Sequence, residues 1–176
     1  EGVEIIRQKA WEPNQLYKKI TGRKKTASID SSIFKDQEKS FINRVAIWVR
    51  GNIFIPDARM FWIKPSVKRL NDYIQKNNVD VIISTSPPQS THLIANKVAK
   101  QNNIPWLADF RDPWTDIYYY HLLQHSKLSH YFNSRYERNV LEQADLVLTV
   151  GAAFKNTLLS KSSKIDEDKI KVISNG

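Results

Sequence analysis

The chain has 176 residues, of which 41% are hydrophobic and 26% are charged, a composition typical of a globular domain and unlike that of a disordered chain. It contains no cysteine, which excludes disulfides, thiolate-bound zinc and a cysteine nucleophile. Its 27 Lys and Arg against 18 Asp and Glu give a formal charge of +9, which attracts nucleic acid, anionic lipid headgroups or phosphorylated substrates without choosing among them.

The first half of the chain contains one short strand signal and two helix signals. Val3–Arg7 is rich in β-branched residues and is predicted to be a strand, whereas residues 11–32 are polar, as a long loop would be. Apolar side chains at helical spacing predict a helix over residues 34–50, and Gly51 stands where helices commonly stop. A second helix is expected over residues 65–77.

From residue 80 onward, short apolar strands alternate with helices. Strands are predicted at residues 80–84, 104–110, 146–150 and 170–173, and apolar stripes at helical spacing lie at 94–99, 132–144 and 154–159. This alternation is typical of parallel strands joined by right-handed crossovers through helices. The sequence therefore predicts an α/β, Rossmann-like fold with a mostly parallel sheet and helices on both faces.

Unusual polar residues follow the predicted strands, at the edge of the sheet where such folds bind ligands. They occupy residues 84–92 after one strand, 109–114 after the next, Gly151 after the third and 175–176 after the last. Because the carboxyl ends of parallel strands meet at the same edge, these residues are expected to share one rim.

Several of these polar groups also have a structural interpretation. Ser90 or Thr91 can cap the helix that follows, and Pro87–Pro88 can stiffen the turn before it. His92 begins a predicted helix, where it can bond to the backbone or line a cleft. It has no second ligand at helical spacing, so a metal is not expected.

Arg111 and Asp112 directly follow a hydrophobic strand end. Burial of either charge without a partner would be costly, so each needs an ion pair, a ligand or water. Pairing of Arg111 with Asp109 or Asp112, which would only brace the loop, stays open as the alternative to a role in binding.

The sequence lacks the motifs that define four common enzyme classes. It contains no Gly-x-Gly-x-x-Gly dinucleotide fingerprint, Walker phosphate loop, Gly-x-Ser-x-Gly elbow or His-Glu-x-x-His motif. Dehydrogenase, nucleotide hydrolase, serine hydrolase and zinc protease functions therefore lack their defining residues.

Four segments resemble the N-terminal domain of bacterial family-four glycosyltransferases, which have the two-lobe GT-B fold. They are residues 79–88 with His92, residues 104–114, residues 137–145 and residues 173–176. The resemblance covers about residues 53–176 and rests on the order and spacing of these motifs. In such enzymes the C-terminal lobe holds the nucleotide-sugar and the N-terminal lobe receives the acceptor. The sugar is transferred with retention of anomeric configuration and usually without a metal.

The resemblance implies roles for the residues of the rim. Arg111 would be a catalytic residue in contact with the acceptor or the leaving group, and Asp112 would orient it. The acceptor pocket would be lined by Ser86, Pro87, His92, Asp109 and Trp114, while Gly151 and Asn175 would lie on the nucleotide-sugar side. No cofactor or metal is expected, and the nucleotide-sugar is a substrate bound mainly by the second lobe.

The resemblance also implies that residues 1–176 form a single acceptor-side domain, a fragment without the C-terminal donor-binding lobe. The family pattern opens with a strand and a glycine-rich loop, whereas Val3–Arg7 looks like a later strand. We therefore expect the fragment alone to be inactive, with exposed sheet edges that invite self-association.

The leading hypothesis is sugar transfer to a polysaccharide or lipid-linked glycan, in the cytoplasm at the inner face of the cytoplasmic membrane. Phe54, Phe61, Trp62 and Tyr118–Tyr120 are the candidates for contact with anionic headgroups, and Trp62 fits a core position as well. No apolar run is long enough to span a bilayer, and the start of the chain does not resemble a signal peptide.

Two other functions stay open. The charge would also suit a non-catalytic nucleic-acid-binding module, but no predicted helix carries a basic stripe with aromatic residues at stacking spacing, so nucleic acid is not expected as a partner. A Rossmann-fold enzyme acting on small molecules, such as a nucleotide-sugar epimerase, would share the fold.

Overall fold

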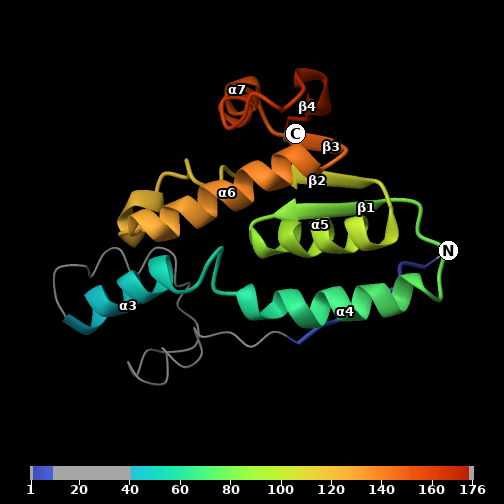
Figure 1. Ribbon diagram of the computed structural model, residues 1–176, viewed down its shortest axis with the longest axis horizontal. Helices are drawn as coiled ribbons and strands as arrows, with labels where there is room; N and C mark the ends of the chain where they lie inside the picture. Colours follow the sequence, from blue (N-terminus) through green and yellow to red (C-terminus); the bar gives the residue numbers. More distant parts are fainter. Residues whose placement is uncertain (1, 10–40, 175–176) are drawn as a thin grey trace.

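A computed structural model describes residues 2–9 and 41–174 of the chain (Figure 1). Within them lies one sheet of four parallel strands in the order β1-β2-β3-β4. The strands are β1 (Ile82–Ser86), β2 (Trp106–Phe110), β3 (Leu146–Thr149) and β4 (Ile170–Val172). The predicted α/β, Rossmann-like class with a parallel sheet is thus confirmed, and all four predicted strands after residue 80 are present.

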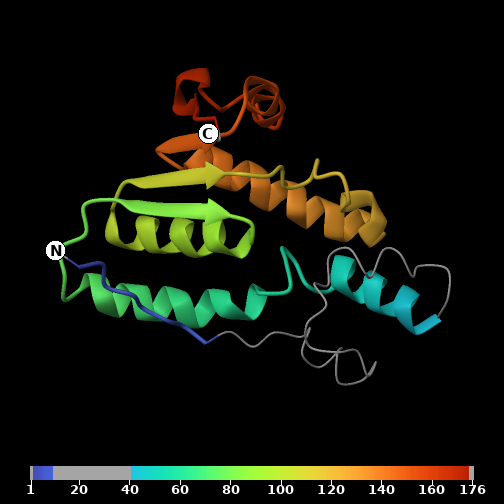
Figure 2. The same cartoon turned by 180° about the vertical axis from the view of Figure 1, so that it is seen from behind.

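Three crossover helices join these strands: α5 (Ser90–Asn102), α6 (Lys127–Gln143) and α7 (Ala152–Leu159). Right-handed crossovers that always step in the same direction place their helices on one face of a sheet. Figure 2 shows β1 and β2 on the near side, with α5 and α6 behind them. On the near face Ile83 is 64% exposed. The three crossover helices therefore lie on one face of the sheet.

The hydrophobic core lies between the sheet and these helices. Apolar side chains from alternate positions of each strand face the helices, as the period of a β-strand requires. The largest members of this core, nearly inaccessible to solvent, are Trp106, Phe110, Leu141, Leu158 and Ile170. The burial of these side chains supplies the main driving force for folding and fixes which face of each strand is turned away from solvent.

Two further helices precede the sheet. Helix α4 (Ile63–Ile74), after a short 3₁₀ turn, η1 (Met60–Trp62), packs along α5 beside β1 (Figure 1). Helix α3 (Phe41–Asn52) is the described part of the helix predicted over residues 34–50. Within the described residues, no helix combines the length and the apolar character that crossing a membrane requires.

The strand predicted at Val3–Arg7 is wrong. Residues 2–9 form no strand and no helix, and Val3 is 90% exposed. This segment approaches α4, where the hydroxyl of Tyr73 donates a hydrogen bond to Glu4 at 2.9 Å. A β-rich composition produces a strand only where a neighbouring strand offers its backbone groups, and this segment pairs with none.

Helix α3 is fastened to the first turn of α6 by polar contacts at its own last turn. The carbonyl oxygen of Gly51 accepts hydrogen bonds from the ring of His125 and from the hydroxyl of Ser129. The side chain of Asn52 accepts a bond from the backbone nitrogen of Ser126 at 2.6 Å. A side chain at Gly51 would overlap the carbonyl oxygen of Leu123, so glycine allows this close approach.

We predict that Gly51→Ala destabilises the protein by about 1–3 kcal/mol, because the added methyl group must push α3 away from the backbone of Leu123. Urea unfolding followed by circular dichroism measures the effect. The matched control is Gly151→Ala, because a methyl group at Gly151 meets open space and should change stability only slightly. Equal unfolding midpoints for the two variants would contradict the close packing of α3.

Candidate functional site

The carboxyl ends of the strands form one rim. Ser86, Phe110 and Thr149 are register partners across β1, β2 and β3. One residue beyond β2, the backbone nitrogen of Arg111 donates a hydrogen bond to the carbonyl oxygen of Ser86 at 3.3 Å. The parallel ladder therefore brings the backbones of Ser86 and Arg111 side by side at the mouth of the sheet, although the two residues are 25 positions apart in the sequence.

Asp109 holds the side chain of Arg111 at this rim. The guanidinium Nε donates to Asp109 Oδ2 at 2.8 Å, and the hydroxyl of Thr85 donates to the same oxygen at 3.3 Å. The Asp109 side chain is 8% exposed, whereas that of Arg111 is 48% exposed. A nearly buried carboxylate needs such a partner, so the ion pair fixes a half-exposed cation at the mouth.

The expected role of Asp112 differs from what the geometry shows. The sequence interpretation has Asp112 orienting Arg111, but in the described part of the chain no hydrogen bond or ion pair joins the two side chains. Asp109, which precedes Arg111 by two residues on β2, makes that contact instead. The reason is the alternation of a strand, which turns Asp109 and Arg111 to the same face.

His92 is a core residue and does not line an open pocket, contrary to the sequence expectation. Its ring is fully buried and stacks on Phe110 with centroids 4.5 Å apart. Trp106 Nε1 donates to Ser84 Oγ at 2.8 Å, and the Ser84 hydroxyl forms a second hydrogen bond with His92 Nδ1 at 2.7 Å. Burial lowers the pKa of His92 to about 3, so the ring is neutral at physiological pH.

Helix α5 is capped by a distant carboxylate. Asp57 Oδ2 accepts a hydrogen bond from the backbone nitrogen of Ser90 at 2.7 Å. The expected cap by Ser90 or Thr91 is not formed, because Ser90 Oγ makes no hydrogen bond and the Thr91 hydroxyl donates to the carbonyl oxygens of Thr85 and Pro88. Sequence reasoning missed this contact, since Asp57 lies 33 residues before the helix that it caps.

Several buried polar atoms near the rim make no hydrogen bond within the described chain. Each such atom normally costs about 1–3 kcal/mol unless water or a ligand supplies a partner. They are Ser86 Oγ, Gln89 Oε1, Ser90 Oγ, His92 Nε2 and Thr149 Oγ1. Ser86 and Thr149 share a register row at the strand ends, and both side chains are buried, at 0% and 1% exposure.

The remaining predicted site residues have different placements. Pro87 is exposed in the turn between β1 and α5. Trp114 is 3% exposed, and its Nε1 donates to Asn133 in the core, so it braces the loop and does not form a pocket wall. Gly151 stands directly after β3 as the N-cap of α7. Asn175 lies outside the described residues.

A buried carboxylate that sequence reasoning missed holds the loop after β2. Glu137 on α6 is fully buried, and its Oε2 accepts from the hydroxyl of Thr115 at 2.5 Å and lies 3.6 Å from the ammonium of Lys161. Burial raises the pKa of Glu137, and the bonds from Thr115 and the charge of Lys161 oppose that rise. Glu137 lies on the same buried side of α6 as Asn133 and Val140, and this helical spacing could have indicated from the sequence that its carboxylate is buried.

An apolar pocket of about 270 Å³ adjoins the rim between α4, α5 and the outer edge of β1. It reaches Thr85, the residue that bonds to Asp109, and Thr91 in the first turn of α5. Two of its lining groups, Trp62 Nε1 and Ser66 Oγ, are buried and form no hydrogen bond within the described chain. An apolar cavity with a few polar groups is typical of a ligand site.

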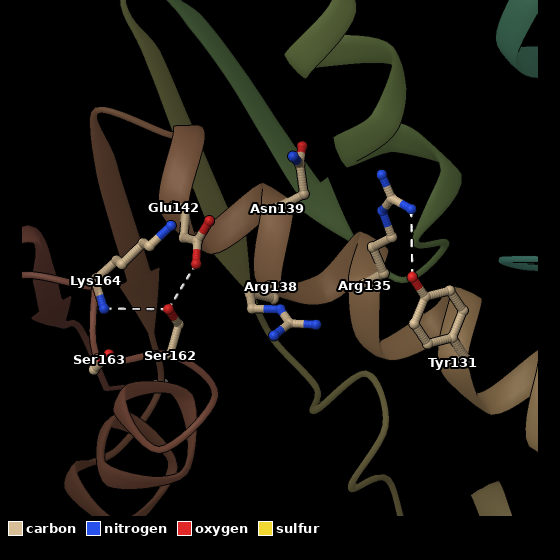
Figure 3. A pocket seen from close by; sticks show the side chains of 8 residues that line it. All are labelled: Tyr131, Arg135, Arg138, Asn139, Glu142, Ser162, Ser163 and Lys164. Carbon is tan, nitrogen blue, oxygen red and sulfur yellow. Dashed lines mark hydrogen bonds between the residues drawn. The ribbon is translucent and has the colours of Figure 1, made fainter.

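A larger groove, of about 460 Å³, lies away from the rim, between α6 and the loop before β4. Figure 3 shows Arg135 and Arg138 on one helix, with Glu142 bonded to Ser162 across the groove. Just after the end of α6, the backbone nitrogen of Asp145 donates to the carbonyl oxygen of Trp106 at the amino end of β2. The groove runs along α6 from Tyr131 to Glu142, and none of its lining residues belongs to the candidate site.

The rim supports electrostatic chemistry on an oxygen-rich substrate. The guanidinium of Arg111 suits a phosphate or an oxygen that gains negative charge. Across residues 2–9 and 41–174, no group of three His, Cys, Asp or Glu side chains is placed to hold a metal ion.

Comparison with known protein families gives a match over most of the chain. A model of the family described as Glycosyltransferase Family 4 matches residues 30–176, a range that includes the whole sheet and the rim. The curated proteins include none that matches the chain significantly.

We predict that His92 makes the protein less stable in mild acid. The folded-state pKa of about 3 lies below the ordinary value of 6.5, so the unfolded chain binds more protons as the pH falls below 6.5. Between pH 7 and pH 5 this costs about 2 kcal/mol of folding free energy. Urea titrations of the wild type and His92→Gln at both pH values measure it. The same loss in both proteins would rule out His92 as its source.

Proposed function

This chain belongs to glycosyltransferase family 4, and we propose that it is the acceptor-binding lobe of a retaining glycosyltransferase with the two-lobe GT-B fold. The observation that carries the proposal is the Asp109–Arg111 ion pair at the mouth of the parallel sheet. It holds a half-exposed cation where open α/β sheets bind their ligands. The reaction moves a sugar from a nucleotide-sugar to a polysaccharide or lipid-linked acceptor.

Arg111 stabilises the negative charge that develops as the glycosidic bond to the diphosphate breaks, or it binds a charged group of the acceptor. A guanidinium held in place before the reaction needs no reorganisation when that charge appears, which is why such groups lower barriers effectively. Asp109 is the positioning residue, because its carboxylate fixes the guanidinium. Asp112, half-buried next to Arg111 on the loop, is proposed to contact the acceptor.

The acceptor binds along the rim and extends toward the apolar pocket beside β1. Ser86 offers an unused hydroxyl at the strand end, and Thr85 links the Asp109 carboxylate to the pocket. A sugar that carries an apolar carrier would match this sequence of polar and apolar surfaces. The nucleotide-sugar is held mainly by a second lobe outside these residues, with Gly151 and Asn175 on its side, so residues 1–176 alone are proposed to be inactive.

We predict that Arg111→Ala lowers sugar transfer by the full-length protein about 100-fold or more in kcat, because the developing charge loses its preplaced cation. Transfer from radiolabelled nucleotide-sugar to the acceptor measures the rate. The matched control is Arg138→Ala, which removes an arginine from the groove along α6 and should leave the rate unchanged. Equal rates for the two variants would refute the assignment of Arg111.

Two serines on β1 allow a second comparison. Ser86→Ala should leave stability unchanged, since Ser86 Oγ has no partner in the described chain, and should raise KM for the acceptor about 2- to 10-fold. Ser84→Ala should lower stability by about 1–3 kcal/mol, because it leaves Trp106 Nε1 and His92 Nδ1 unpaired, with little effect on KM. Thermal unfolding and acceptor titrations check both. A loss of stability in Ser86→Ala would indicate a structural hydroxyl instead.

A further inference from the structure

Thr115, on the loop after β2, lies at a junction of three elements. Its hydroxyl donates a hydrogen bond to Glu137 Oε2 at 2.5 Å and accepts one from Lys161 Nζ at 2.9 Å. Glu137 belongs to α6, and Lys161 lies just beyond the end of α7. The ammonium of Lys161 also pairs with Asp116, the next residue of the loop. The loop after β2 is therefore held by two crossover units of the sheet.

This junction anchors the loop that begins at Arg111, because Thr115 follows Arg111 by only four positions. Between them, Trp114 is 3% exposed and donates from Nε1 to the side chain of Asn133 on α6. At the other end of the loop, Asp109 holds the guanidinium from β2. The loop is thus fixed at both ends, and the placement of the guanidinium depends on contacts made outside the rim.

The charges at the junction are a weak source of stability. Glu137 is fully buried and the side chain of Lys161 is 19% exposed, so both charges lose water on folding. They lie 3.6 Å apart, which is longer than the contact of a strong ion pair. Apolar side chains often replace such buried pairs without loss of stability, whereas a polar network favours one arrangement of its members. The junction therefore suits a role in geometry more than a role in stability.

We propose that the junction of Thr115, Glu137 and Lys161 positions Arg111 for sugar transfer. The carboxylate of Glu137 fixes Thr115, and the loop then keeps the guanidinium aligned with the charge that develops on the leaving group. Misplacement of the guanidinium weakens binding of the transition state more than binding of the substrate, so kcat responds and KM does not. This inference rests on the proposed function, because it requires Arg111 to take part in transfer.

Two variants of Thr115 in the full-length protein test the junction. Thr115→Val removes the hydroxyl and nearly keeps the shape, so it should lower kcat about tenfold and leave KM for the nucleotide-sugar within about twofold. Thr115→Ser keeps the hydroxyl and should transfer at about the wild-type rate. Transfer from radiolabelled nucleotide-sugar measures both constants. Equal kcat values for Thr115→Val and wild type would overturn the inference.

A matched pair of glutamates on α6 separates positioning from general support of the fold. Glu142 also accepts a hydrogen bond from a loop hydroxyl, that of Ser162 at 2.6 Å, but this contact lies in the groove along α6. Glu137→Gln should lower kcat about tenfold, whereas Glu142→Gln should leave it unchanged. Urea midpoints measure the stability of each variant. If Glu137→Gln does not fold, the Thr115 variants decide the question.

A double variant shows whether the junction acts through Arg111. Once Arg111→Ala has removed the guanidinium, loss of the Thr115 hydroxyl has nothing left to misplace. Thr115→Val combined with Arg111→Ala should therefore transfer at the rate of Arg111→Ala alone. Losses that multiply in the double variant would contradict positioning through Arg111.

Hydrogen exchange followed by mass spectrometry examines the loop without an activity assay. The backbone nitrogen of Thr115 donates to Glu137 Oε1 at 3.4 Å, and Thr115→Val should speed exchange of the amides of residues 112–116 about tenfold. Unchanged exchange in this loop, or faster exchange with an unchanged kcat, would overturn this inference alone. A wild-type rate in Arg111→Ala would instead refute the proposed function, and the inference with it.

Discussion

The hydrogen-bond register between β1 and β2 determines where every group of the candidate site lies. It sets Ser86 beside Phe110 and lets the backbone of Arg111 extend the ladder to Ser86. The same register places Thr85 opposite Asp109, so that two neighbouring strands share one carboxylate. A shift of one residue would turn Asp109 into the core and Phe110 to the open face, and would abolish both the core and the ion pair.

Polar groups inside the protein are arranged to hold this rim in place. The chain from Trp106 through Ser84 to His92 ties β2, β1 and α5 together beneath the strand ends. Glu137 ties the loop after β2 to α6 through Thr115. Buried polar networks stabilise one arrangement strongly, because breaking a single bond leaves the others unpaired. These bonds hold the loop and strand ends around the half-exposed Arg111, which Asp109 fixes in turn.

The alternating strands and helices after residue 80 could be predicted, because apolar runs and helical spacing are local signals. The convergence of Ser86 and Arg111 followed from the parallel topology alone. The roles of His92 and Ser90 could not be predicted, since they depend on partners such as Ser84 and Asp57 that only the folded chain supplies. Val3–Arg7 shows the same limit, because strand propensity cannot reveal whether a neighbouring strand exists.

The two bonds accepted by the carbonyl of Gly51 have a mechanical consequence. They join α3 to the first turn of α6, and farther along α6 the carboxylate of Glu137 grips the loop that begins at Arg111. Helix α6 thus connects α3 to the loop at the carboxyl end of β2. A displacement of α3 would therefore be transmitted along α6 to the loop that follows Arg111.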